Sequence, residues 1–134
     1  MKWIGFLPVT YSERFDNLFL DPSTTYETET IAPDFLNNKR QVGSATGHLL
    51  GWVLTAPGPA NVRYRVQFRF PMGSNVWRTW ITYTIPAFGQ NVATGLTSRM
   101  VFVPPLPELR FSFENLSGVV FTYVEGVIAL WSLT

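Results

Sequence analysis

One histidine and a few scattered carboxylates are the residues of this 134-residue chain that could perform chemistry. A serine–histidine relay or a histidine metal cluster would have to be built around His48, beside Gly47 and ahead of an apolar pair. The sequence lacks a G-x-S-x-G elbow, an H-E-x-x-H pair and a glycine-rich phosphate loop. We therefore predict no catalytic residue, and we expect His48 to lie on the surface at the end of a strand.

Paired carboxylates are the other route to catalysis, because glycoside hydrolysis needs two carboxyl groups across a cleft. Glu27 and Glu29 alternate with threonines, so we expect both to be solvated. Three more carboxylates, Glu108, Glu114 and Glu125, could approach one another across neighbouring strands. Each is expected to pair with an arginine, such as Arg63 or Arg110, and the sequence therefore predicts a protein that is not an enzyme.

Metal and cofactor sites are not predicted either. The chain has no cysteine, which excludes disulfides, thiol catalysis and thiolate metal ligands. Asp21 and Asp34 lack the alternating acidic ligands of a calcium loop. We expect neither a metal ion nor a cofactor.

The elements that would position any site are strands. Between Val62 and Phe70, apolar side chains alternate with polar ones, among them Arg63, Arg65 and Arg69. Period two in a strand gives one apolar and one cationic face. The predicted strands are Leu49–Thr55, Val62–Phe70, Trp77–Ile85, Arg99–Val103, Leu109–Glu114 and Val119–Leu130. Turn-forming segments rich in Pro, Gly and Asn separate them, which predicts an all-β domain over residues 46–134, a single antiparallel β-sandwich or jelly roll.

Residues 1–45 lack this sustained alternation, and we interpret them as an extended N-terminal arm. Ser12 to Phe19 could form one or two helical turns, with Ser12 as a weak cap. Tyr26 to Ile31 alternates threonine with glutamate and could form an edge strand, whose charges would discourage unwanted pairing.

The composition predicts a homo-oligomer. The chain is 46% hydrophobic and 16% aromatic but only 14% charged, which suggests more apolar surface than one small core can bury. Such surplus surface ends in a subunit interface or in a ligand groove, and arginine with aromatic rings is typical of an interface centre. The candidate interface residues are Trp3, Phe6, Phe15, Phe19, Arg63, Arg65, Arg69, Trp77, Trp80 and Trp131.

Nucleic acid and membrane are not expected as partners. The formal charge is +1, and the basic residues form no clustered footprint. No apolar run approaches the length of a membrane-spanning helix. The run from Trp3 to Leu7 is too short for the core of a signal peptide, so we expect no signal peptide.

Residues 62–131 resemble the small β-sandwich domains of phage virion proteins. The resemblance is carried by Phe68-Arg69-Phe70, Gly73 to Trp77, Ser98 to Val103, Leu109 to Gly118 and the final strand Val119 to Trp131. It implies a non-enzymatic structural protein of the virion, either a capsid decoration or a tail component. Such a protein would self-assemble and bind other virion proteins, would be made in the host cytoplasm and would reside in the virion.

A carbohydrate-binding or receptor-binding module is the alternative that the same resemblance implies. Trp77 and Trp80 fall on opposite faces of one predicted strand, so at least one ring is expected to leave the core. An exposed ring of this kind could stack on a sugar, which would make a glycan the partner.

Overall fold

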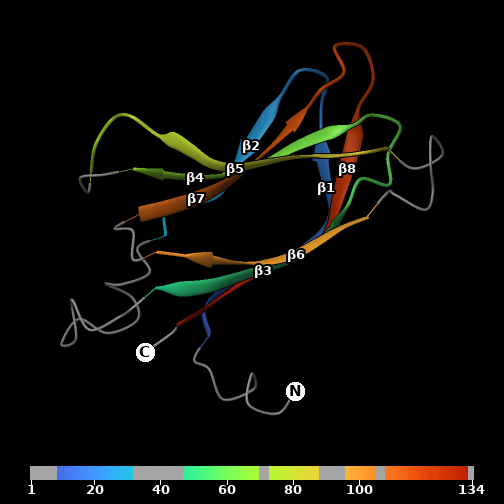
Figure 1. Ribbon diagram of the computed structural model, residues 1–134. Helices are drawn as coiled ribbons and strands as arrows, with labels where there is room; N and C mark the ends of the chain where they lie inside the picture. The colour runs from blue at the N-terminus through green and yellow to red at the C-terminus, as the bar shows by residue number, and fades with distance from the viewer. Residues whose placement is uncertain (1–8, 32–46, 70–72, 88–95, 105–107, 133–134) are drawn as a thin grey trace.

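A computed structural model describes residues 9–31, 47–69, 73–87, 96–104 and 108–132, and these ranges contain eight strands (Figure 1). The strands are β1 (Val9–Leu20), β2 (Thr25–Glu27), β3 (His48–Thr55), β4 (Val62–Arg69), β5 (Arg78–Ile85), β6 (Leu96–Val103), β7 (Glu108–Asn115) and β8 (Thr122–Ser132). The described ranges contain no helix, and so none that is long and apolar enough to cross a membrane.

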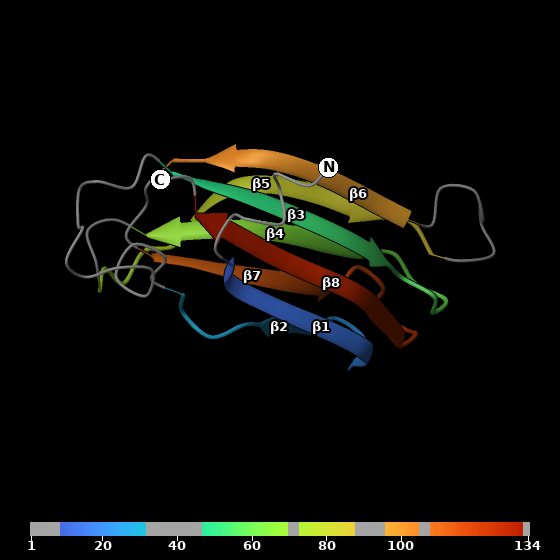
Figure 2. The same cartoon turned by 90° about the horizontal axis from the view of Figure 1, so that it is seen from below.

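Two antiparallel sheets of four strands pack face to face. The first sheet has the order β1-β8-β3-β6 and the second has the order β2-β7-β4-β5 (Figure 2). Successive strands alternate between the sheets, and only β4 and β5 form a hairpin within one sheet. This eight-stranded order is that of a jelly roll, so the predicted fold class is confirmed.

The predicted helical turns between Ser12 and Phe19 are wrong, because these residues lie in β1. β1 pairs with β8, which brings Phe15 opposite Gly126 and Leu20 opposite Thr122, and both Phe15 and Leu20 are buried in the core. The edge strand expected after Tyr26 is shorter than predicted and ends at Glu27. Residues 9–31 therefore supply an edge strand to each sheet, and this part of the predicted arm belongs to the sandwich. The other residues of the predicted arm lie outside the described ranges.

The core between the sheets is built from aromatic rings. Tyr64 of β4 stacks on Phe113 of β7 with ring centroids 5.4 Å apart, and Trp52 of β3 meets Tyr64 edge-on at 5.2 Å. Phe15 meets Phe113 at 5.0 Å. Each large ring buried in this way contributes on the order of 2 kcal/mol through removal of apolar surface from water. The contacts of Trp52 with Tyr64 and of Phe15 with Phe113 join the two sheets.

β8 lies between β1 and β3, as the apolar character of both its faces suggests. At its centre, Gly126 has a φ of +139°, and a Cβ atom there would lie 1.9 Å from the carbonyl oxygen of Val53. Only glycine fits this close approach between β8 and β3.

Candidate interaction surfaces

The outer face of the second sheet is neutralised by ion pairs between strands. Arg63 and Arg65 of β4 lie 3.2 Å and 3.4 Å from the Glu114 carboxylate of β7. Arg110 lies 3.0 Å from Glu27 of β2, so the pairs run across three neighbouring strands. The prediction that Glu114 pairs with an arginine is confirmed.

Glu108 is the most buried member of this set. Arg69 donates a hydrogen bond to its carboxylate at 2.6 Å from Nε, and the backbone N–H of Gly73 donates another at 2.8 Å. These two bonds, the arginine's first, hold the pKa of the Glu108 carboxyl below its usual range. Arg69 also donates to the carbonyl oxygen of Ser74 at 3.0 Å, so the pair contacts Gly73 and Ser74 ahead of β5.

Trp77 packs against the same arginines. The guanidinium carbons of Arg69 and Arg110 lie 4.6 Å and 4.3 Å from the centre of its ring. Trp80 instead meets Phe68 edge-on at 6.1 Å and remains 41% exposed. Of the two tryptophans that the sequence offered for sugar stacking, Trp80 therefore has the more accessible ring.

The outer face of the first sheet is largely apolar over β8, β3 and β6, and the side chains described there form no such ion pairs. Since the alternate residues Leu50, Trp52 and Leu54 of β3 are buried, the residues between them point outward. The row at one end of these strands contains the charged Glu125 of β8 opposite Thr55 of β3. We call the three rows beyond it the apolar face: Trp131-Leu49-Phe102, Ala129-Gly51-Met100 and Val127-Val53-Ser98. None of them is charged.

A shallow hollow of about 220 Å³ lies in the apolar face above Gly51. Side-chain atoms of Trp131 and Met100 lie 3.1 Å and 3.4 Å from the position that a Cβ atom of Gly51 would occupy. The absence of a side chain at Gly51 thus leaves a depression between one aromatic and one thioether side chain, with Val53 and Val127 along its wall. Such a depression can accept an apolar side chain of a partner.

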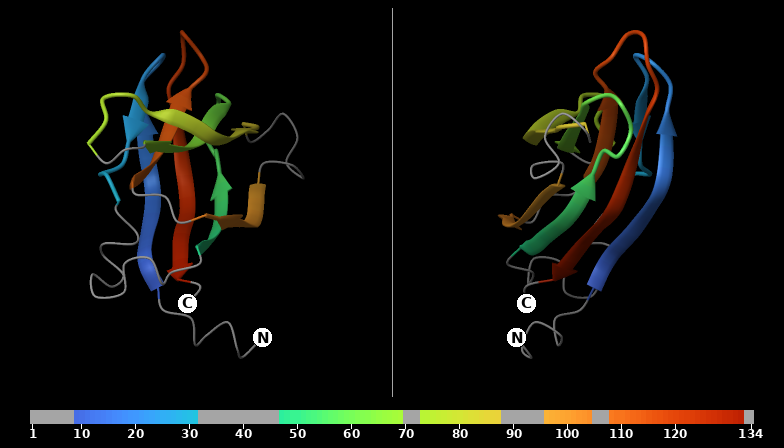
Figure 3. Two further views of the ribbon diagram at one scale, coloured as in Figure 1. Left: turned by 60° about the vertical axis from the view of Figure 1, so that its left-hand side comes forward. Right: turned by 90° about the vertical axis from the view of Figure 1, so that its right-hand side faces the viewer.

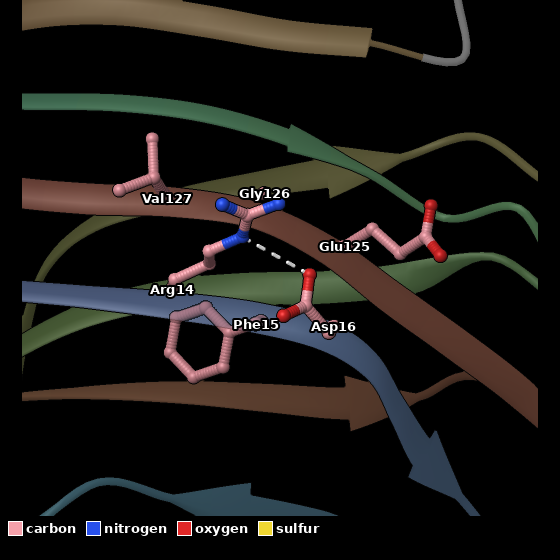
Figure 4. A pocket seen from close by; sticks show the side chains of 6 residues that line it. All are labelled: Arg14, Phe15, Asp16, Glu125, Gly126 and Val127. Atoms are coloured by element: carbon pink, nitrogen blue, oxygen red, sulfur yellow. Dashed lines mark hydrogen bonds and ion pairs between the residues drawn. The ribbon is translucent and has the colours of Figure 1, made fainter.

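A second hollow, of about 460 Å³, lies over Gly126 between β1 and β8 (Figure 4). The Arg14 guanidinium lies over the glycine and forms an exposed ion pair with Asp16 at 3.1 Å. Glu125 is half-buried on the same outer face. Exposed pairs of this kind contribute little to stability, and this hollow is wide and open to solvent.

The loop between β7 and β8 lies at one end of the sandwich (Figure 3), and it carries exposed apolar side chains. Val119 is 84% exposed, and Val120 and Phe121 beside it are also exposed. Phe121 stacks on Phe19 at 5.6 Å and meets Tyr123 at 5.5 Å. We call these five residues the apolar tip. Sequence analysis missed it, because Val119 to Phe121 continue the apolar run of the final strand.

A cleft of about 340 Å³ between the edge strands β1 and β2 holds two tyrosines and two carboxylates. The Tyr11 hydroxyl donates a hydrogen bond to the Glu13 carboxylate. Burial, then this hydrogen bond, raises the pKa of Tyr11; burial and the charges of Glu13 and Glu29 raise the pKa of Tyr26. Both hydroxyls therefore stay protonated and keep a hydrogen that they can donate in this cleft.

Several predicted positions need correction. Phe15 is no interface residue, because it is 4% exposed and packs in the core. His48 is fully buried, where the sequence placed it on the surface. Trp3 and Phe6 lie outside the described residues. Phe19, Trp80 and Trp131 reach the surface, and the three arginines of β4 lie in the ion-pair network.

Comparison with known proteins finds solved structures with a similar fold but does not assign the chain to a family. No protein family matches the sequence, and no curated protein matches it. Among solved structures, the PBSX exported protein XepA resembles the chain with a TM-score of 0.55 and 16% identity over 91% of this chain. The chain spans only 36% of the XepA chain. PirA gives a TM-score of 0.48 and 11% identity, covering 92% of this chain and 94% of PirA. At these identities the likeness to XepA shows the shared fold alone.

Proposed function

We propose that this protein is a non-enzymatic structural protein of a bacteriophage particle, a capsid decoration or a tail component, that assembles with copies of itself. The likeness to XepA, a phage-derived exported protein, supports a phage origin. Some of the described carboxylates lie in ion pairs, as a role without catalysis predicts. Glu108 and Glu114 are engaged by arginines, and Asp16 lies in an exposed ion pair.

The apolar face of the first sheet is the observation that carries this proposal. Its rows combine Trp131, Met100, Phe102, Val53 and Val127 without a charged side chain. Burial of apolar surface contributes about 25 cal/mol per Å², and a stable interface buries roughly 800 Å² on each partner. The face has the composition that such an interface needs, whereas the second sheet presents paired charges to solvent.

Light scattering over a range of protein concentrations tests the proposal. Self-assembly predicts a mass that exceeds the 15.2 kDa of one chain and rises with concentration. Negative-stain images of the same samples should then show rings, clusters or filaments of uniform size. A mass of 15.2 kDa at every concentration up to the millimolar range would contradict self-assembly.

A carbohydrate-binding module is the second candidate, and the exposed ring of Trp80 favours it. Sugars stack on such rings, and Arg78 precedes Trp80 on β5. A glycan array with the natural protein and with Trp80→Ala tests this role. Binding that the substitution abolishes would support the second candidate, and an array without signal would exclude the glycans that it carries.

A further inference from the structure

The sandwich has four edge strands, and three of them are protected against pairing with another chain. Exposed edges present unpaired N–H and C=O groups, which natural proteins shield with bulges, charges or short length. β1 shifts register twice in its pairing with β8, has a φ of +52° at Asn17 and carries Arg14 and Asp16. β2 is three residues long, and β5 carries Arg78 and an irregularity opposite Val66 and Gln67.

β6 has neither a bulge nor a short length, and it carries one charged residue. Its eight residues pair with β3 without interruption, from Leu96 opposite Thr55 to Val103 opposite His48. It contains no proline or glycine, and within the described residues β3 is the one strand that pairs with it. Its single charged residue, Arg99, has its guanidinium 5.4 Å from the ring of Tyr83 in the second sheet. The outer side of this edge is therefore uncharged.

The outward side chains of β6 continue the apolar face to this edge. Met100 is 49% exposed and Phe102 is 53% exposed. Across β3 they adjoin Gly51 and Leu49, and beyond those the outward residues of β8. The strand edge and the apolar face thus form one uninterrupted surface, with β6 at one side of the first sheet (Figure 2).

We propose that β6 pairs with β6 of a second copy of this chain, antiparallel and around a twofold axis. The pairing joins two first sheets into one sheet of eight strands, and it places the two apolar faces side by side. The inference rests on the proposed self-assembly and names the surface through which it begins.

The position of the axis follows from two constraints. Opposed residues in an antiparallel pair point to the same side of the sheet, so the axis passes through one residue that meets its own copy. An axis at Arg99 would place two guanidinium groups opposite each other, which destabilises a pair. An axis at Met100 pairs residues 97–103, with Ser98 opposite Phe102 and Arg99 opposite Val101. It gives the longest overlap that keeps the two arginines apart.

A second copy fits this edge better than a charged partner protein does. In a twofold pair, a charged side chain near the axis faces a like charge, which penalises self-association. The outward residues nearest the proposed axis are Ser98, Met100 and Phe102, all uncharged. No charge on this side of the edge offers an attraction to a charged partner either.

A cross-linking experiment tests the axis, because the natural chain has no cysteine. Opposed Cα atoms in an antiparallel pair are about 4.5–5.5 Å apart, which is within the range of a disulfide. Met100→Cys should therefore form a disulfide-linked dimer under mild oxidation. Ser98→Cys is the matched control, since its own copy would lie four residues away along the pair. Efficient cross-linking at Met100 with little at Ser98 supports the register, and equal cross-linking at both sites, or none at Met100, overturns it.

Light scattering with Phe102→Lys tests the surface independently. We expect a drop in mass at concentrations where the natural protein is assembled, with at least tenfold weaker association. Phe19→Lys is the matched control, because Phe19 is 50% exposed on the opposite edge strand; it should leave the mass unchanged. If the natural protein assembles and Phe102→Lys assembles equally well, the β6 pair is overturned while the proposed function stands. A monomeric natural protein overturns both.

Discussion

Removal of the Asn115 side chain should loosen the end of the sandwich that carries the apolar tip. Asn115 ends β7 and is 2% exposed. Its amide nitrogen donates to the carbonyl oxygen of Val120 at 2.8 Å and to those of Leu20 and Asp21 at 3.2 Å. Its amide oxygen accepts a hydrogen bond from the N–H of Ser117 at 2.8 Å. One side chain thus ties the β1–β2 corner to the β7–β8 loop.

The expected cost of Asn115→Ala follows from these bonds. A neutral hydrogen bond contributes about 1 kcal/mol net, and each buried group left without a partner costs about 1–3 kcal/mol. Water can reach part of the exposed loop, so we expect a loss of about 2–4 kcal/mol in the free energy of unfolding. For a domain of this size, the loss should lower Tm by roughly 10 °C. Asn75→Ala, at an exposed loop position, is the control and should change Tm little.

Asn115→Asp keeps a side chain of the same shape but removes the N–H donors of the amide. A comparison with Asn115→Ala therefore separates the effect of lost packing from the effect of lost hydrogen-bond donors. The carboxylate would face the carbonyl oxygens of Leu20, Asp21 and Val120, and this repulsion raises its folded-state pKa above the unfolded value. The penalty is then present above the folded-state pKa and fades as pH falls towards the unfolded value of about 4. Thermal unfolding by near-ultraviolet circular dichroism from pH 4 to pH 8 should show the aspartate variant falling below the alanine variant as pH rises. Parallel pH profiles of the two variants, or an Asn115→Ala loss no larger than that of Asn75→Ala, would refute the role given to this side chain.

Two further substitutions test the ion-pair network and the close approach of β8. Glu108→Gln should cost about 1–3 kcal/mol at pH 7, because the bonds from Arg69 and Gly73 are made to a charged group. Because the folded-state pKa of Glu108 is lowered, this contribution is present above the unfolded-state pKa and is lost as pH falls through the folded-state pKa. The free energies of unfolding of the natural protein and the variant, measured in urea, should therefore converge in acid. A difference that stays constant with pH would contradict this. Gly126→Ala should abolish soluble expression, because its Cβ would lie 1.9 Å from the Val53 oxygen. Gly73→Ala, with a φ of +81° but no atom within 4 Å of the new Cβ, should cost only about 1–2 kcal/mol in urea unfolding, and equal losses at the two glycines would refute the steric argument.

The sequence predicted those features that depend on local alternation. The period-two pattern of β4 was sufficient to place Arg63 and Arg65 on one face, and Glu114 on the neighbouring strand was available to pair with them. The burial of Phe15 could not be predicted in this way, because it depends on β8, which follows more than 100 residues later in the chain. His48 is similar: it precedes an apolar run, and its pairing with Val103 and Ser132 takes it into the protein.

The difference between the two outer faces gives the strongest argument for where the proposed partners would bind. Both faces belong to four-stranded sheets of similar length, so the fold itself does not require one to be polar and the other apolar. On the second sheet, Arg63, Arg69 and Arg110 find carboxylates within the chain, and these pairs leave little attraction for a partner. On the first sheet, the apolar face exposes large apolar side chains, and their removal from water would stabilise a complex in which a partner covers them. Phe19 and Tyr123 of the apolar tip pair across β1 and β8, and their buried neighbours Leu20, Thr122 and Val124 point into the core. The tip therefore lies on the same outer side of this sheet as the apolar face, and a partner that covers the face would approach both from one side.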